Sequence, residues 1–290
     1  MSQPNYPGEV TDANICAIFR DAADFNIRPL RCGEFTLHTY AIDGLIAANS
    51  ASDYIFKPII QELSGDSMQS LYDTALHGGI YNSVAKPCED LEQIALMLVN
   101  GFCVVLFPDA GAIAFEVKTP TMRSIGSPEV ENTVKGPKDA FVETIRTNTS
   151  LIRRHLRTPK LRLFETQVGE KSLTNVAVVW VEDVTEPELV QRIKDRLASL
   201  QIDSLISPAA VEEFVTGSRM TAFPLLQYTE RTDRFCQGLL SGQVGLIVDG
   251  LPQGYLLPVD IHQDLFQRSA VFLIHSEEKE RKHDHDHQAG

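Results

Sequence analysis

The longest apolar stretch of the chain, Ile94 to Phe107, limits what the chain can fold into. It is interrupted by Asn100 and Gly101 and is shorter than the roughly 20 apolar residues of a membrane-spanning helix. Its first part has helical spacing and ends at Gly101, a residue type that often caps a helix. The second part, Phe102–Phe107, is a continuous apolar run typical of a buried strand. We therefore expect a helix that leads directly into a buried strand of a soluble protein.

Strand and helix patterns alternate along the rest of the chain. A Pro-Asp-Ala-Gly turn at 108–111 connects the buried strand to a further strand, and the two should form a hairpin. Helical spacing predicts helices over 54–63, 90–100, 137–156, 186–200 and 211–215. Strands are predicted over 35–46, 102–107, 112–117, 162–168, 175–181 and 244–248. This alternation predicts an α/β fold with mixed sheets, and Thr158-Pro159 is the best boundary between two lobes.

The predicted boundaries divide the chain into four segments. Residues 1–30 form a polar leader with one short helix, for which we expect loose packing. A first α/β lobe with a linking helix occupies 31–158, and a second α/β lobe occupies 159–258. An alternative returns residues 240–258 to the first lobe. Residues 259–290 are a charged, His-rich tail that we expect to be disordered or to result from a shifted reading frame.

Charge and cysteine content exclude several classes of function. The chain has 26 Lys and Arg against 39 Asp and Glu, and its net charge of −13 would repel the phosphates of nucleic acid. Its five cysteines are scattered without CxxC spacing, which indicates free thiols in a reducing compartment. The first thirty residues have neither the basic start nor the apolar run of a secretory signal. We expect no nucleic-acid partner and no export.

Motifs for catalysis and for cofactors are absent from the sequence. None of GxSxG, GxxxxGK[ST], GxGxxG and HExxH occurs, so we expect no enzyme activity and no cofactor. A triad assembled from distant residues, in an enzyme of unknown class, remains the alternative. His283, His285 and His287 have side chains that bind Zn or Ni ions. Because a terminal His-Asp run outside a packed domain is usually an unstructured tail, we assign no metal site.

One segment is basic in this otherwise acidic chain. It lies within 151–162 and contains Arg153, Arg154, Arg157, Lys160 and Arg162. The acidic stretch before it carries Glu129 and Glu131, which could pair with Arg153 or Arg154. The basic run is otherwise a solvated helix face, an internal salt-bridge partner, or a surface for an acidic partner or lipid head groups.

Three segments resemble one known family, the A subunits of the GerA-type spore germination (nutrient germinant) receptors. Residues 127–154 read SPEVENTVKGPKDAFVETIRTNTSLIRR. They are similar to the family order of an acidic segment with Pro, a basic Gly-Pro, Phe-x-Glu, and Asn before Leu-Ile-Arg-Arg. The sequences ERTD at 230–233 and VDGLP at 248–252 follow in the expected order, although the family usually has Pro where Thr232 stands. The resemblance extends from near residue 30 to 258.

The resemblance implies a soluble, two-lobed, mixed-sheet α/β module resembling a substrate-binding protein. In full-length relatives this N-terminal region is attached to the spore inner membrane through a following membrane domain of several helices. That domain is missing from the present sequence, so we expect the chain as written to be soluble and on the cytoplasmic side. A truncation and a frame shift are both open explanations.

The function implied by the resemblance is sensing, signal transmission and assembly, which couple nutrient detection to spore germination. Its partners would be the B and C subunits of the receptor, further copies of the A subunit, and a small nutrient ligand. The residues implied in binding or assembly are Glu129, Glu131, Gly136, Pro137, Asn148, Arg153, Arg154, Glu230, Arg231 and Asp233.

Two alternatives remain open. The chain could be a stand-alone soluble small-molecule-binding protein that uses the cleft between its lobes. Some of the implied residues also have a purely structural reading. Gly136 and Pro137 would then shape a helix start, and residues 230–233 would form a buried polar network.

Overall fold

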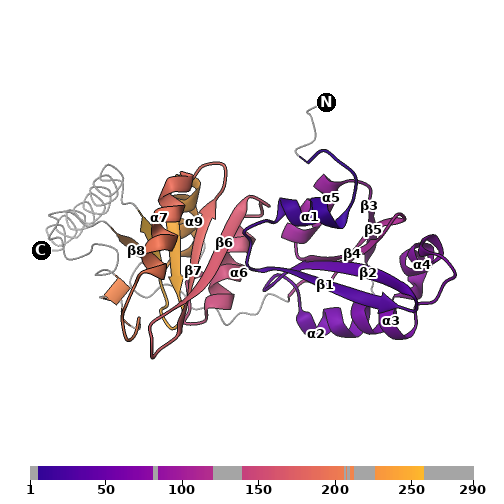
Figure 1. Cartoon of the computed structure of the whole chain (residues 1–290), viewed down its shortest axis with the longest axis horizontal. Coiled ribbons are helices and arrows are strands. Elements are labelled where there is room, and N and C mark those ends of the chain that lie inside the picture. Colours follow the sequence, from indigo (N-terminus) through magenta and orange to yellow (C-terminus); the bar gives the residue numbers. More distant parts are fainter. Residues whose placement is uncertain are drawn as a thin grey trace, which may run out of the picture.

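The computed structural model describes residues 6–80, 84–119, 139–205, 207, 210–211 and 226–257. Within these ranges the strands form two five-stranded sheets that follow one another along the chain (Figure 1). Every ladder between named strands is antiparallel. A parallel bridge connects Ala22, before the first sheet, to Leu163 at the edge of the second. The two-lobed α/β fold expected from the sequence is therefore confirmed, whereas the expected mixed sheets are wrong because both sheets are antiparallel.

The first sheet has the order β1-β2-β4-β5-β3 and is covered on both faces (Figure 1). Its strands are β1 (Phe25–Cys32), β2 (Phe35–Ile42), β3 (Ala85–Cys88), β4 (Phe102–Phe107) and β5 (Gly111–Glu116). One face packs against α1 (Asp12–Ile18) and α5 (Leu91–Val99). The other packs against the chain of short helices α2 (Ala48–Ala51), η1 (Ser52–Phe56), α3 (Lys57–Gln61), α4 (Met68–Thr74) and η2 (Ala75–Gly79).

The second sheet has the order β6-β7-β9-β10-β8 and is also covered on both faces. Its strands are β6 (Leu161–Val168), β7 (Thr174–Val181), β8 (Gln227–Thr229), β9 (Val244–Val248) and β10 (Gly254–Leu257). The helices α6 (Ile145–His155) and α9 (Thr232–Leu240) cover one face, and α7 (Pro187–Ala198) covers the other. We call residues 6–119 the first lobe and residues 139–257 the second lobe.

The helix–glycine–strand expected at the longest apolar stretch is present. Asp90 caps α5 by accepting a hydrogen bond from the Gln93 amide at 2.8 Å. Gly101 follows with a φ of +80°, and a Cβ atom there would lie 2.9 Å from the Leu45 carbonyl oxygen. The chain then enters β4, all of whose residues are buried. Gly101 is thus required both for its left-handed backbone and for the close approach of Leu45.

The prediction that residues 1–30 form a loosely packed leader is wrong. Ile15 and Phe19 lie in the core of the first lobe, and β1 pairs with β2 along its whole length. The sequence pattern did not predict this strand because β1 lies at the edge of its sheet. Only two of its residues, Leu30 and Cys32, are buried, so the run lacks the apolar alternation of a strand. An edge strand needs no apolar alternation, and Pro29 is tolerated there.

The predicted helix over 137–156 begins later than expected. Residues 137–138 lie outside the described ranges, 139–144 are not helical, and α6 starts at Ile145. This helix packs on the second sheet, with Ile145 and Ile152 in one core cluster with β6, β7 and α9. It therefore belongs to the second lobe, not to the first as expected. The helix predicted over 54–63 starts earlier, at Ala48.

The alternative that returned residues 240–258 to the first lobe is wrong, because β9 and β10 pair with β7 and β8. Most of the helix predicted over 211–215 lies outside the described residues, as does the tail over 259–290. In the part of the chain that the structure describes, the helices are too short or too polar to cross a membrane.

We predict that Gly101→Ala destabilises the protein more than Gly33→Ala. Both glycines have positive φ, but a Cβ atom at Gly33 would meet nothing within 4 Å. Gly33→Ala should therefore cost only the left-handed strain of about 1–2 kcal/mol, and Gly101→Ala should add the clash with Leu45. Urea unfolding of the two variants measures the difference. Equal losses would contradict the close approach.

Candidate functional site

The most strongly buried charges in the described structure lie where the two lobes meet. Arg153 of α6 donates two hydrogen bonds to Asp24, from Nε to Oδ2 and from Nη2 to Oδ1, both at 2.7 Å. Each side chain is 1% exposed. Bidentate geometry makes this the strongest type of ion pair available, and its burial makes it costly to leave either partner alone. The pair joins the second lobe to the first.

Helix α6 makes contacts on two faces. Its apolar face carries Ile145 and Ile152 and packs on the second sheet. Its other face presents Arg146, Ser150 and Arg153 to the first lobe, at a spacing of four and three residues that aligns side chains along a helix. The sequence folds as this helix because one stripe is apolar and the opposite stripe is polar.

Arg146 and Ser150 meet the turn that follows β2. Arg146 Nε lies 3.3 Å from Asp43 Oδ2, and its Nη1 donates to Glu165 of β6 at 3.0 Å. A Cβ atom at Gly44 would lie 2.7 Å from Ser150 Cβ, so the helix and the turn are in direct contact. One arginine thus connects a carboxylate of the first lobe to one of the second.

The connection between α1 and β1 is held against the edge strand β6. The Leu163 amide donates to the Asp21 carbonyl at 2.9 Å, and the Ala23 amide donates to the Leu163 carbonyl at 2.8 Å. Arg162 Nη1 donates to the Ile18 carbonyl at 2.9 Å. Asp21 has a φ of +54°, which lets its carbonyl turn toward β6.

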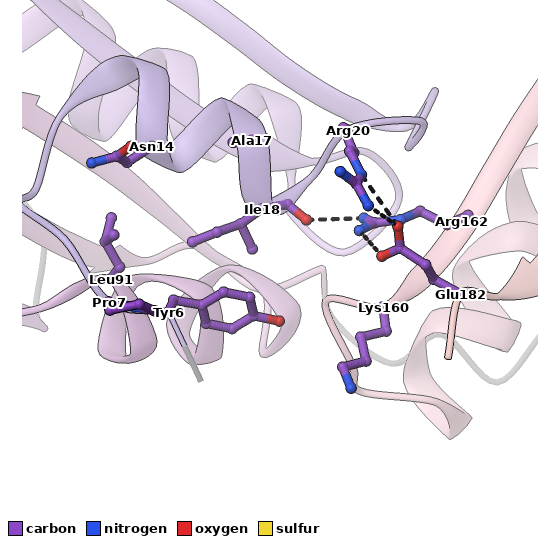
Figure 2. Close-up of a pocket in the computed structure, with 10 residues that line it drawn as sticks. All are labelled: Tyr6, Pro7, Asn14, Ala17, Ile18, Arg20, Leu91, Lys160, Arg162 and Glu182. Carbon is purple, nitrogen blue, oxygen red and sulfur yellow. Dashed lines mark hydrogen bonds and ion pairs between the residues drawn. The ribbon is translucent and has the colours of Figure 1, made fainter. Parts of the chain in front are cut away.

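Glu182 joins two arginines at the rim of the same interface (Figure 2). It accepts hydrogen bonds from Arg20 of the first lobe and from Arg162 of β6. Burial by itself would raise the pKa of Glu182, but the hydrogen bonds from Arg20 and Arg162 outweigh it and lower the pKa. Glu182 is therefore held ionised by cations from both lobes.

A cavity of about 260 Å³ opens beside these arginines. It lies between α1, α5 and the nearest end of the second sheet (Figure 2), and it is lined by Tyr6, Pro7, Asn14, Ala17, Ile18, Arg20, Leu91, Lys160, Arg162 and Glu182. Lys160 donates to Asp183 at 2.6 Å. Burial raises the pKa of Tyr6 although Lys160 and Arg162 act in the opposite direction. The lining offers cations and a phenol to an anionic or polar small molecule.

The described residues contain no group of three or more His, Cys, Asp or Glu arranged to hold a metal ion. Burial raises the pKa of the Cys103 and Cys236 thiols to about 12. These thiols are therefore neutral and unreactive at neutral pH.

The residues implied by the resemblance meet around the start of α6. Buried Asn148 receives a hydrogen bond from the Val142 amide at 2.8 Å and donates to the Val142 carbonyl at 2.5 Å. The Phe141 amide donates to the Glu230 carbonyl at 2.8 Å. Arg231 is bridged to Ala140 through the backbone. These contacts hold residues 140–142 outside the helix, which explains why the helix starts later than its sequence pattern.

The VDGLP segment holds the same helix from the other side. Asp249 Oδ1 accepts a hydrogen bond from the Ile145 amide at 3.0 Å, and the Gly250 amide donates to the Glu143 carbonyl at 2.7 Å. A carboxylate at this position satisfies a free amide and complements the helix dipole. Both shorter segments that carry the resemblance therefore contact the longest one at, or just before, the start of α6.

The other residues implied by the resemblance lie on α6, at the start of α9, or outside the described residues. Arg231 donates to Asp233 from Nε at 3.0 Å and from Nη2 at 2.5 Å. Burial would raise the pKa of Asp233, but Arg231 lowers it. Arg154 is half-buried on α6, and its carbonyl accepts from Arg157. Outside the described residues lie Glu129, Glu131, Gly136 and Pro137.

Three carboxylates at the interface were not singled out from the sequence: Asp24, Asp43 and Glu182. Asp24 lies 129 positions from Arg153 in the chain, inside the segment interpreted as a loose leader. The described partner of Arg153 is this residue, and the other candidate partners, Glu129 and Glu131, lie outside the described residues. Arg153 and Arg162 of the basic run form internal ion pairs, one of the alternatives left open by the sequence, but no local pattern identifies the partners.

Comparisons with known proteins find the same family that the three segments resemble. Residues 13–270 match the family model of the Bacillus/Clostridium GerA spore germination protein. The chain is 30% identical to spore germination protein B1 of Bacillus subtilis (strain 168) over 228 residues, which cover 77% of this chain and 46% of that protein. It is 36% identical to spore germination protein XA of Bacillus anthracis over 170 residues, 58% of this chain and 34% of the relative.

The fold also has a solved counterpart. The crystal structure of the N-terminal domain of the A subunit of the Bacillus megaterium spore germinant receptor GerK3 is similar with a TM-score of 0.65 and 21% sequence identity. The match covers 86% of this chain and 93% of that domain. The chain spans less than half the length of the curated relatives named above.

We predict that Arg153→Met destabilises the protein by about 3–5 kcal/mol, because it leaves Asp24 buried and unpaired. The double variant Asp24→Asn with Arg153→Met should recover much of that loss. Arg146→Met removes an exposed arginine of the same helix and should cost under about 1 kcal/mol. Urea unfolding measures all three. A loss for Arg153→Met no larger than that for Arg146→Met would contradict the assignment.

We predict a pH-dependent contribution from Glu182. Its pKa is lowered on folding, so its stabilising effect is complete above the ordinary value of 4.5 and is lost as the pH falls through the folded value. The difference in unfolding free energy between the wild type and Glu182→Gln should therefore be largest near pH 7 and shrink below pH 4.5. Urea unfolding at several pH values measures this difference. A difference independent of pH would contradict the pairing.

Proposed function

This chain belongs to the GerA family of spore germination proteins, and from that premise we propose that it is the signal-transmitting and assembly module of a germinant receptor. One observation carries the proposal. The two shorter segments that carry the resemblance both contact the longest one around the start of α6, and α6 also reaches the first lobe through Arg146 and Arg153. The segments that carry the resemblance thus hold in place a helix that connects the lobes, as a transmitting element requires.

The proposed partners are the B and C subunits of the receptor and further copies of the A subunit. In this proposal the module acts at the cytoplasmic side of the spore inner membrane and couples nutrient detection to germination. The curated relatives are more than twice as long as the matched region, so the chain would supply one module of such a receptor. We propose no catalytic role for it.

A second candidate function is small-molecule binding by the chain itself. The cavity at the lobe interface supports it, because Arg20, Lys160 and Arg162 line it beside a single lining carboxylate, Glu182. Calorimetry against amino acids, sugars and nucleosides separates the two candidates. Saturable heat with one of these compounds, lost in Arg20→Ala, would favour a binding protein. Absence of heat with all of them would favour a transmitting module.

We predict that deleting the gene from its native spore-forming host slows germination with at least one nutrient. The loss of optical density of a spore suspension after nutrient addition measures the rate. Reintroducing the wild-type gene should restore it, whereas Asp24→Asn with Arg153→Met should restore it only in part, because α6 then loses its charged attachment to the first lobe. Arg146→Met serves as the matched control on the same helix.

Normal germination of the deletion spores with every nutrient tested would contradict the proposed function. Full restoration by the double variant, at wild-type protein level, would contradict the role given to α6. An immunoblot of whole-spore extracts supplies that protein level.

A further inference from the structure

We propose that the segment Ile18–Asp24, held by Arg162, Leu163 and Arg153, clasps the two lobes into one rigid body. The module would then transmit a signal by moving as a unit, and a hinge between its lobes would not open and close. This inference goes beyond the proposed function and relies on it only for what the movement signals.

The clasp is concentrated in one short connection between α1 and β1. Four different contacts with the second lobe come from these seven consecutive residues. They are the Ile18 carbonyl with Arg162, the Arg20 side chain with Glu182, the backbone of Asp21 and Ala23 with Leu163, and Asp24 with Arg153. Backbone bonds, an exposed charge pair and a buried charge pair thus act on the same segment.

The contacts of the clasp also differ in how strongly salt weakens them. Arg20 is 67% exposed, so salt screens its interaction with Glu182. The Arg153–Asp24 pair is shielded from solvent and is screened much less. High salt should therefore weaken the rim of the clasp and leave its buried part in place.

Attachments outside the clasp fix the orientation of the lobes. Arg146 meets Asp43 in the turn after β2, and Gly44 in that turn contacts Ser150. Arg157 donates to Asn100 at the end of α5, at 3.3 Å. Together with the clasp, three separate segments of the first lobe are attached to the second. A rotation between the lobes would therefore have to break attachments in more than one place.

A hinge opening would have to break several of these attachments together. Rotation about the Ala22–Leu163 bridge would pull Asp24 away from Arg153 at one end and the Ile18 carbonyl away from Arg162 at the other. A small rotation would leave both charges still buried and unpaired, which is the most costly arrangement for an ion pair. The interface therefore favours a single orientation.

Distances between spin labels on the two lobes test the clasp in the full 290-residue chain. Glu62→Cys after α3 and Arg192→Cys on α7 place one label on an exposed site of each lobe. Cys16→Ser removes the half-buried thiol, and the other four cysteines are buried. Pulsed electron spin resonance then gives the distribution of distances between the labels.

We predict one narrow distance distribution for this labelled protein, unchanged in 1 M sodium chloride. Adding Arg153→Met should at least double its width or add a second maximum. Lys171→Met is the matched control, because it removes a lysine paired with Asp203 within the second lobe, and it should leave the distribution narrow.

Two results would overturn the clasp. One is a broad or two-peaked distribution in the labelled protein without further change, which needs no destabilising variant and so decides the matter even if Arg153→Met fails to fold. The other is an unchanged width in a folded Arg153→Met protein. Neither result depends on the germination assay, so failure of the clasp and failure of the proposed function are distinguishable.

Discussion

The arrangement of the two lobes depends on the buried ion pair between Arg153 and Asp24. Burying a charge is unfavourable unless its partner and its hydrogen bonds come with it, and both side chains here are excluded from solvent. The pair is satisfied only when α6 lies against the connection between α1 and β1. The rest of the interface follows from that placement, since the same helix brings Arg146 to the turn after β2.

Local signals predicted the elements whose stability is local. The α5–Gly101–β4 sequence has a cap, a glycine and a buried run in consecutive positions, and the structure has all three. β1 lacks such a signal because it is an edge strand with few buried residues. The start of α6 was misplaced for a different reason. Contacts from residues distant in sequence, Glu230 and Asp249, hold Phe141 before the helix and Ile145 at its start, and helical spacing contains no information about them.

The sequence identified some residues of the candidate site but not their interaction partners. The resemblance pointed to Arg153 and Asn148, and both are buried in the structure. Their partners show why the sequence could not complete the site. Asn148 binds the backbone of Val142, six residues away, which any side chain there would offer. Asp24 is one of three aspartates in a polar segment, and it is placed beside α6 by contacts distant in sequence, such as the parallel bridge between Ala22 and Leu163.

The cavity and the clasp share residues, which connects the two candidate functions. Ile18, Arg20, Arg162 and Glu182 line the cavity and also hold the lobes together. An anion in the cavity would compete with Glu182 for Arg20 and Arg162, whereas a cation would compete with them for Glu182. Because coupling between binding and an interface is reciprocal, either ligand would alter the strength of the clasp, and the state of the clasp would alter the affinity for the ligand. Ligand binding in the cavity would therefore be coupled to the attachment between the lobes.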